Sequence, residues 1–421
     1  MPQDRKLRFI TAAFFWGVLL SYIWVVPRFY DYGARGYADF SAFYTAGKIV
    51  QSGQGHQLYD RTVQTQVQKE FSEAARVRGQ ALPYLRLPFE ALLFVPLTFL
   101  SYAREYQVWA GISILLVLGV AKYLRSRMSE ETEWPWWIYY PAYFSYWPIA
   151  YGLALGQDCG LMLCLCALMM VHLRDRRDFR AGCLLGLALI KFQIVLPLIL
   201  VLVLKKQFRV LAGFSAVAAP LFGLSVWVVG WQGLMAYPSY LWGLNRVPAA
   251  AAIFPGMMPS LRGLVQGWMD PMHSSWILNL IAGVLSVAVL IWAAGQWRAS
   301  ESRRSKVYLA GLDAVFLAGL LAAYHMFSYD LTLLLPSVLR AAQTGLDDTV
   351  LDRSARWALL LGAGALLLTP LYFLLVGYAR VNLMALALLL LAWGLARACR
   401  TWQRTEDVDV SSKSGAVSLS A

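Results

Sequence analysis

Residues 179–204 read FRAGCLLGLALIKFQIVLPLILVLVL, an apolar run flanked on both sides by basic clusters, RDRR at residues 174–177 and KKQFR at residues 205–209. A bilayer core of about 30 Å takes about 20 apolar residues per helix, and short basic loops stay in the cytoplasm. Two basic flanks therefore predict two short helices in a hairpin, with Lys191 at its outer bend. One straight span would instead place Lys191 in mid-membrane and one basic loop on the wrong side.

The composition identifies a polytopic membrane protein. Of 421 residues, 59% are hydrophobic and 14% charged, and the mean hydropathy is +0.53. The formal charge of +13 is explained by cytoplasmic loops and contact with membrane lipids, so no nucleic-acid partner is expected. Five cysteines in apolar segments and only 4 histidines favour neither a disulfide framework nor a metal site. We expect no metal and no cofactor.

Loop charges predict an all-α transmembrane bundle of about 12 spans in one membrane domain, residues 1–404. Two external segments, residues 27–87 and 230–273, should carry short surface helices, and residues 405–421 a disordered cytoplasmic tail. Spans are expected near residues 9–26, 88–124 with a break at 101–105, 135–152, 156–172, the 179–204 hairpin, 210–229, 276–294, 307–323, 329–339, 357–374 and 382–396.

This assignment of spans and loops places several polar residues at the external face, although it was derived from loop charges without using them. They are Asp39, Gln157, Lys191, Arg262, His325 and Asp330. Asp39 lies in an apolar and aromatic stretch, ADFSAFYTAG at residues 38–47, which makes it the best candidate for a catalytic base. The alternative is an N-cap for a helix that starts at Phe40.

Lys191 has no acidic residue three or four positions away, and an ionisable group in an apolar segment indicates function. An ammonium in an apolar cleft suits a lipid-linked phosphate, and the alternative is a lysine that extends to the interface. Arg86 and Arg262 are either further phosphate contacts or headgroup anchors.

His325 and Asp330 close a later apolar segment and lie five positions apart, so they can meet only if the chain turns between them. A packed interfacial histidine and an N-cap for a helix beginning at Leu331 are their structural alternatives. No phosphate-binding glycine-rich loop, zinc motif or serine elbow is present.

Four stretches together resemble glycosyltransferase family 87, also called domain of unknown function 2029. They are residues 39–47 with LYD at 58–60, residues 87–97 (LPFEALLFVPL), Gly156 and Gln157 with residues 186–193 (GLALIKFQ) and Pro197, and His325 with YDL at 329–331 and Pro336. The resemblance implies a GT-C fold enzyme that uses polyprenyl-phosphate sugars, similar to mycobacterial polyprenol-phosphate-mannose-dependent alpha-1,2-mannosyltransferases.

The resemblance further implies that Asp39 is the catalytic carboxylate and that Lys191 and His325 lie near the donor phosphate. Further site candidates are Gln157, Asp158, Glu90, Asp330 and Tyr44. Glu90 and Asp158 stand where the family more often has an apolar residue and an asparagine, so a mannose preference is not carried over.

The predicted function is transfer of a hexose, of mannosyl type, from a polyprenyl monophosphate sugar to a hydroxyl of a lipid-linked or cell-envelope glycan. The reaction would be inverting and metal-independent, at the external face of the cytoplasmic membrane, with Asp39 as general base. The alternative is a lipid or small-solute transporter or flippase. Such proteins often have internal repeats, and no second copy of the Asp39 or Lys191 environment occurs in the sequence.

Overall fold

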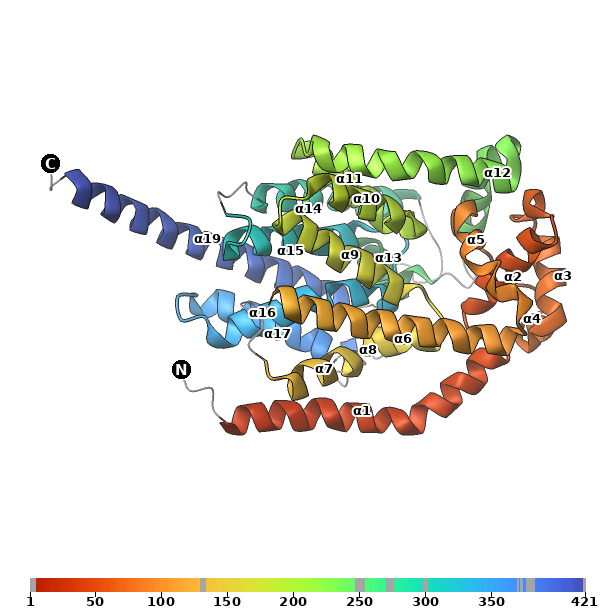
Figure 1. Ribbon diagram of the computed structural model, residues 1–421, viewed down its shortest axis with the longest axis horizontal. Coiled ribbons are helices and arrows are strands. Elements are labelled where there is room, and N and C mark those ends of the chain that lie inside the picture. The colour runs from red at the N-terminus through yellow and green to blue at the C-terminus, as the bar shows by residue number, and fades with distance from the viewer. Residues whose placement is uncertain are drawn as a thin grey trace.

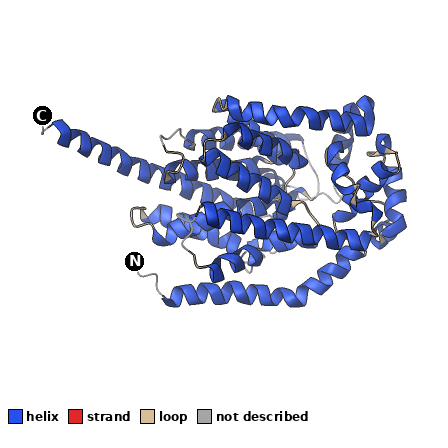
Figure 2. Cartoon of the chain, viewed as in Figure 1, coloured by secondary structure: helices blue, strands red, loops and turns tan. Residues whose placement is uncertain are grey.

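The computed structural model describes residues 5–128, 134–246, 254–269, 276–297, 302–368, 371, 374–375 and 383–418. Helices joined by turns and loops make up this part of the chain, and no strand occurs in it (Figure 1, Figure 2). The predicted all-α class is confirmed.

Six helical stretches in the described part are long and apolar enough to cross a membrane, which supports a multi-pass membrane protein. They lie in α1 (Arg5–Ala34), α6 (Tyr102–Arg127), the combined α10 (Asp178–Leu187) and α11 (Phe192–Leu204), α12 (Phe208–Arg246), α14 (Trp276–Gln296) and α19 (Met384–Ser418). The predicted number was about 12. The difference arises because many expected spans are helices of 8 to 17 residues: α7 (Trp136–Ser145), α8 (Trp147–Ala154), α9 (Cys159–Arg174), α15 (Lys306–Ala322), α16 (Leu335–Asp347) and α17 (Arg353–Leu367).

Three predicted boundaries need correction. Helix α1 continues through Pro27 to Ala34 and ends before the turn at Gly36, where φ is +80°. The expected external segment 230–273 begins as helix, since α12 resumes after the non-helical Gly230. Helix α19 extends to Ser418, through most of the tail that was expected to be disordered. The rest of segment 230–273 holds η7 (Pro255–Met257) and α13 (Leu261–Met269), and its residues 247–253 and 270–273 lie outside the described residues.

The first external segment carries short helices, as expected. Its elements are α2 (Phe40–Gln51), η1 (Gly55–Gln57), α3 (Arg61–Phe71) and α4 (Glu73–Arg78), and they are followed by η2 (Pro88–Glu90), α5 (Ala91–Phe94) and η3 (Leu97–Phe99). Helix α2 is not a surface helix, because it is buried in an aromatic core with Phe94 and Tyr102. The break predicted at residues 101–105 lies slightly earlier, between the end of η3 at Phe99 and the start of α6 at Tyr102.

Residues 178–204 form the predicted hairpin. The 3-10 turn η5 (Ala188–Lys191) joins α10 to α11, and the backbone leaves helical geometry at Lys191, where φ is −117° and ψ is 63°. Gly182 of α10 packs against the backbone of Val210 near the start of α12, with no room for a Cβ. Because α11 ends just before α12 begins, both ends of the run lie together and Lys191 lies at the opposite end.

Basic loops gather at one end of the bundle. The guanidinium of Arg174 donates to the carbonyl of Arg127 at 2.8 Å, and Arg303 donates to the carboxylate of Asp178 at 3.0 Å. Helix α9 runs from the level of Lys191 to this basic end and is about 24 Å long at 1.5 Å per residue. In Figure 1 the start of α1 and the end of α19 lie on the left, and α2 to α5 lie on the right.

Candidate functional site

A tight turn between α8 and α9 presents two polar side chains. The amide of Gly156 donates to Leu153 at 3.1 Å and that of Gln157 to Gly152 at 2.9 Å, which is the hydrogen-bond pattern of a Schellman motif. Gly156 has a φ of +63°, a conformation that glycine adopts without strain. The chain therefore leaves α8 sharply and places Gln157 and Asp158 immediately before α9.

The same turn fixes the start of α2. The amide of Phe40 donates to the carbonyl of Leu155 at 3.0 Å, and a Cβ at Gly156 would collide with the Phe40 side chain. Two segments more than a hundred residues apart are thus held in contact through their backbones. As a result, Asp39 lies directly beside Gln157.

Arg86 reaches this place from an extended segment tethered by tyrosines. The hydroxyls of three tyrosines donate to successive backbone carbonyls: Tyr240 to Tyr84 at 3.1 Å, Tyr237 to Leu85 at 2.7 Å and Tyr59 to Arg86 at 2.7 Å. The Arg86 side chain is buried and its guanidinium stacks over the ring of Phe43. The tyrosine contacts fix the backbone from which this charge extends.

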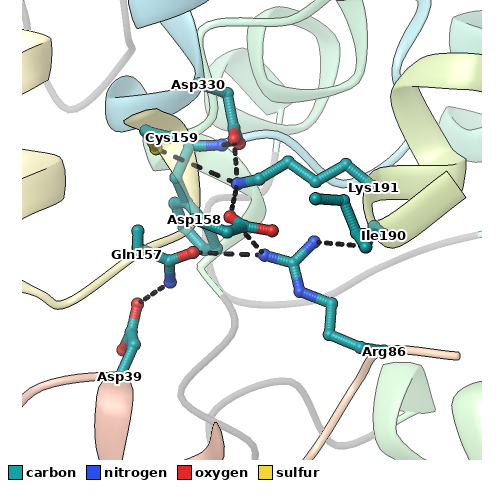
Figure 3. A network of polar contacts seen from close by, with 9 residues as sticks. Asp39, Arg86, Gln157, Asp158, Cys159, Ile190, Lys191 and Asp330 are labelled. Atoms are coloured by element: carbon teal, nitrogen blue, oxygen red, sulfur yellow. Dashed lines mark hydrogen bonds and ion pairs between the residues drawn. The ribbon is translucent and has the colours of Figure 1, made fainter. Parts of the chain in front are cut away.

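The buried guanidinium of Arg86 meets the turn before α9 (Figure 3). It donates to Gln157 Oε1 at 3.1 Å and to Asp158 Oδ1 at 3.5 Å. The Nε2 of Gln157 donates in turn to Asp39 Oδ2 at 2.7 Å. Arg86, Gln157 and Asp39 therefore form one continuous chain of hydrogen bonds.

Lys191 extends this chain on the other side of Asp158. Its ammonium lies 2.8 Å from Asp158 Oδ1 and 2.5 Å from Asp330 Oδ1, and only 1% of the side chain is exposed. It also lies 4.9 Å from the centre of the Tyr329 ring. Lys191 does not extend to the interface; its charge is compensated by two aspartates. We call the set Asp39, Arg86, Gln157, Asp158, Lys191 and Asp330 the polar network.

Asp39 does not cap α2. Its backbone is already helical, with φ −59° and ψ −24°, and its side chain accepts no cap hydrogen bond, so the local alternative is wrong. The side chain is partly exposed. Burial raises the pKa of Asp39 above its ordinary value, although the hydrogen bond from Gln157 and the charge of Arg86 oppose the shift. A carboxylate with raised basicity and an accessible surface fits the demands on a general base.

The pKa values of two further carboxyl groups at this end are shifted in opposite directions. Burial acts against ionisation of Asp158, but the charges of Arg86 and Lys191 outweigh it and hold the pKa of Asp158 below its ordinary value. Burial raises the pKa of Glu90 well above its ordinary value, with Arg86 opposing the shift. Neither oxygen of Glu90 has a hydrogen-bond partner among the described residues. The neighbouring cations thus favour the ionised form of Asp158, whereas burial favours the protonated form of Glu90.

His325 and Arg262 lie on the adjoining segments. Arg262 is buried, donates to the carbonyl of Tyr324 at 3.0 Å and stacks over the ring of Tyr324 at 3.8 Å. Burial and the charges of Arg262 and Arg86 lower the pKa of His325 to about 3. His325 is therefore a neutral imidazole at ordinary pH and can donate or accept a hydrogen bond.

The structure brings most of the predicted residues together but gives two of them other surroundings. Tyr44 donates to the carbonyl of Leu100 at 3.2 Å and packs in the aromatic core around α2, away from the network. Asp330 is not an N-cap at Leu331: η8 (Ser328–Leu334) begins earlier, and Asp330 Oδ2 accepts from the amide of Phe327 at 3.0 Å. Its other oxygen pairs with Lys191.

Sequence reasoning assigned no role to Tyr329 or to the tyrosines that tether Arg86, although Tyr329 and Tyr59 stand in two of the stretches that resemble the family. The only signal for Tyr237 and Tyr240 was the abundance of tyrosine in the chain, 22 residues, and abundance does not distinguish a tether from a membrane belt. In the described part of the chain, no three His, Cys, Asp or Glu side chains are grouped so that they could hold a metal ion.

An apolar cavity of about 500 Å³ lies beside the segments that carry Arg86 and Lys191. It is lined by Leu87 and Phe89 of the η2 segment, by Leu189 of η5, and by α12 residues between Ser215 and Leu234. Leu87 follows Arg86 directly and Leu189 is two positions from Lys191. An apolar chain could therefore lie here with a polar headgroup toward the network.

Comparison with known families identifies one match. The model of glycosyltransferase family 87 matches residues 87–323, more than half of the chain. No curated protein and no solved structure matches. Glu90, Gln157, Asp158, Lys191 and Arg262 lie within the matched segment. Arg86, His325 and Asp330 lie just outside it, and Asp39 lies well before its start.

Proposed function

Because the chain belongs to glycosyltransferase family 87, and is therefore a transferase of the membrane, we propose that it transfers a hexose from a polyprenyl monophosphate to an acceptor hydroxyl. The acceptor is a lipid-linked or cell-envelope glycan. The observation that carries this proposal is the partly exposed residue Asp39, whose carboxylate is held by Gln157 at the edge of a buried ion network. We further propose that the bundle is of the GT-C type, with about 12 membrane passes once its short helices are counted.

Asp39 acts as general base in this reaction. The acceptor oxygen forms a bond to the anomeric carbon, the bond from that carbon to the phosphate oxygen breaks, and the acceptor proton passes to Asp39. Attack from the side opposite the phosphate inverts the anomeric configuration. One carboxylate is enough, because a phosphate can leave without a proton when positive charge and hydrogen-bond donors stabilise it.

Arg262, His325, Arg86 and Lys191 supply that stabilisation. A neutral His325 contributes a hydrogen bond rather than a charge, given its lowered pKa of about 3. Lys191 is occupied by Asp158 and Asp330, so it acts through the field of the network more than through a direct contact. The apolar cavity beside Leu87 and Leu189 accommodates part of the polyprenyl chain.

The active site faces the external side of the cytoplasmic membrane in this proposal. Its support is the separation of the two ends of the bundle: the basic loops around Arg174 and Arg303 gather at one end, and Asp158 lies at the other end of α9. Short basic loops stay in the cytoplasm. The polar network therefore faces outward, where envelope glycans are assembled.

The test is the substitution Asp39→Asn, which keeps the shape and removes the base. Transfer of radiolabelled mannose from a polyprenyl monophosphate, with membrane lipid extract as acceptor source, should fall by roughly a hundredfold to ten-thousandfold. Near wild-type transfer by folded Asp39→Asn protein would refute the base assignment. Uptake of the same label into sealed proteoliposomes, unchanged in Asp39→Asn, would instead favour the transporter alternative.

A further inference from the structure

Gln157 connects Asp39 to the charged residues of the polar network by hydrogen bonds. Its amide donates to Asp39 Oδ2 at 2.7 Å and its carbonyl oxygen accepts from Arg86 at 3.1 Å. Among the described residues, no other side-chain hydrogen bond to Asp39 is recorded. We infer that Gln157 is a positioning residue: it holds Asp39 by Oδ2 and leaves Oδ1 to take the acceptor proton, a role that rests on the proposed general-base function.

The chemistry of the two neighbours fixes the orientation of the Gln157 amide. A guanidinium can only donate hydrogen bonds, so the carbonyl oxygen of Gln157 must face Arg86. An ionised carboxylate can only accept, so the NH₂ group must face Asp39. A glutamate at this position would set a second acceptor against Asp39, and an asparagine would be one methylene too short to reach both partners.

The surroundings of Gln157 allow little freedom. The side chain is 4% exposed, and its backbone follows the Schellman turn at Gly156. Arg86 is bound in addition to Asp158 and to the carbonyl of Ile190 at 3.4 Å. A base held by a rigid second layer of hydrogen bonds keeps a productive geometry with no reorganisation during the reaction.

The ionisation of Asp39 responds to the same hydrogen bond. Burial raises the pKa of Asp39, and the bond from Gln157 is the first of the influences that lower it. The other titratable groups whose charges interact with Asp39 are Arg78 of α4, Arg86, Lys191, Tyr32 of α1, Tyr102 of α6, Tyr151 of α8 and Tyr329 of η8. With these unchanged, loss of the Gln157 bond raises the pKa of Asp39 further. Because the base works only when ionised, the acid limb of the pH–rate profile must then move to higher pH.

The experiment compares Gln157→Met and Gln157→Glu in the full chain, reconstituted in lipid nanodiscs, with mannosyl polyprenyl phosphate as donor and membrane lipid extract as acceptor source. Both variants should lose roughly tenfold to a hundredfold in kcat at mildly acidic pH, which is the worth of a hydrogen bond to a charged group. The KM for the donor should stay within about twofold. The acid limb should move to higher pH, and further in Gln157→Glu, since like charges oppose ionisation.

Gln68 offers a matched control. It is also a buried glutamine with both ends hydrogen-bonded: Nε2 donates to Thr45 at 3.1 Å and Oε1 accepts from the amide of Leu82 at 2.8 Å. Gln68 does not touch Asp39. Gln68→Met should lower thermal stability and leave the acid limb unchanged. If Gln68→Met shifts the acid limb of the pH–rate profile as far as Gln157→Met does, the shift reflects a general loss of stability, and the positioning role is wrong.

Infrared spectroscopy measures the protonation of Asp39 without turnover of the substrate. The carboxylic acid band that disappears in Asp39→Asn reports protonated Asp39, and its titration midpoint should lie at higher pH in both Gln157 variants. An unchanged midpoint and an unchanged acid limb would overturn the positioning role while the general-base role stands, provided Asp39→Asn is inactive. An active Asp39→Asn enzyme would refute the proposed function itself. If Gln157→Met fails to fold, the isosteric Gln157→Glu supplies both measurements.

Discussion

Two buried ion clusters in this bundle differ in how completely their carboxylates are paired. The cluster between α15 and α16 is closed: Asp313 Oδ1 accepts from the Ser337 hydroxyl at 2.6 Å and from Arg340, and Asp313 Oδ2 accepts from Arg340 Nε at 3.1 Å. Both carboxylate oxygens are thus used by partners on the neighbouring helix. This arrangement holds α15 against α16 and leaves nothing for a ligand.

The polar network at the other end is open. Asp158 Oδ1 receives both Arg86 and Lys191, whereas Asp158 Oδ2 has no hydrogen-bond partner among the described residues. Asp158 and Asp330 share the two cations. The third aspartate, Asp39, is linked to them only through Gln157 and is partly exposed. Buried polar groups are ordinarily satisfied, so the unused oxygen of Asp158 is the feature in which the open network differs from the closed cluster.

The largest expected effect tests whether Lys191 supports the open network. Lys191→Met leaves Asp158 and Asp330 buried without their shared cation, which should lower the free energy of unfolding by about 3–5 kcal/mol. Unfolding in mixed micelles with increasing SDS, followed by tryptophan fluorescence, measures the change. The triple variant that adds Asp158→Asn and Asp330→Asn removes the uncompensated charges and should recover most of the loss. If Lys191→Met is as stable as the wild type, the ion pairs do not hold the network together.

The second prediction contrasts the clusters by a matched substitution. Asp313→Asn keeps an oxygen for Arg340 but weakens a charged hydrogen bond, so the free energy of unfolding should fall by about 1–3 kcal/mol. Transfer per folded molecule should remain within about twofold of the wild type, whereas Asp330→Asn should reduce it. Activity normalised to the monodisperse fraction gives both values. An equal loss of transfer in the two variants would show that the closed and open clusters do not differ in their importance for transfer.

Sequence patterns were sufficient for the helical class, the membrane character and the reversal at Lys191. These depend on composition and on charges that lie next to each other in the chain, which a single sequence displays. The family resemblance was confirmed over residues 87–323. The site candidates Arg86, Gln157, Asp158, Lys191 and Asp330 were all named from the sequence, and the structure places them in one network.

What the sequence could not supply was their pairing. A search three or four positions from Lys191 finds no acid, because its partner Asp330 is 139 positions away and Asp158 lies in the turn before α9. Likewise, an aspartate before a helix predicts an N-cap, but only the dihedral angles of Asp39 show that it is none. The end of α1 was misplaced at Pro27 because a proline does not always end a helix in a membrane. Tertiary contacts decide each of these cases.

The smallest expected effect concerns Glu90, the neutral carboxyl beside the open network. Its pKa in the folded protein is raised well above the ordinary value by burial, so the folded form holds a proton that the unfolded chain releases at pH above about 4.3. The contribution of Glu90 to stability therefore falls as pH rises from that value. Glu90→Gln removes this dependence. It should change the free energy of unfolding by less than about 1 kcal/mol at mildly acidic pH, and should become increasingly more stable than the wild type toward alkaline pH.

Unfolding midpoints at a series of pH values decide this prediction, with the exposed Glu70→Gln as a control that removes the same formal charge. Parallel curves for wild type and Glu90→Gln would show that Glu90 is ionised, and hence paired, in the folded protein. That result would also alter the comparison of the two clusters: an ionised Glu90 lies four positions after Arg86 and would compete with Gln157 and Asp158 for its guanidinium. The open network would then have a fourth negative charge, and its capacity to receive a phosphate would be lower than the neutral Glu90 allows.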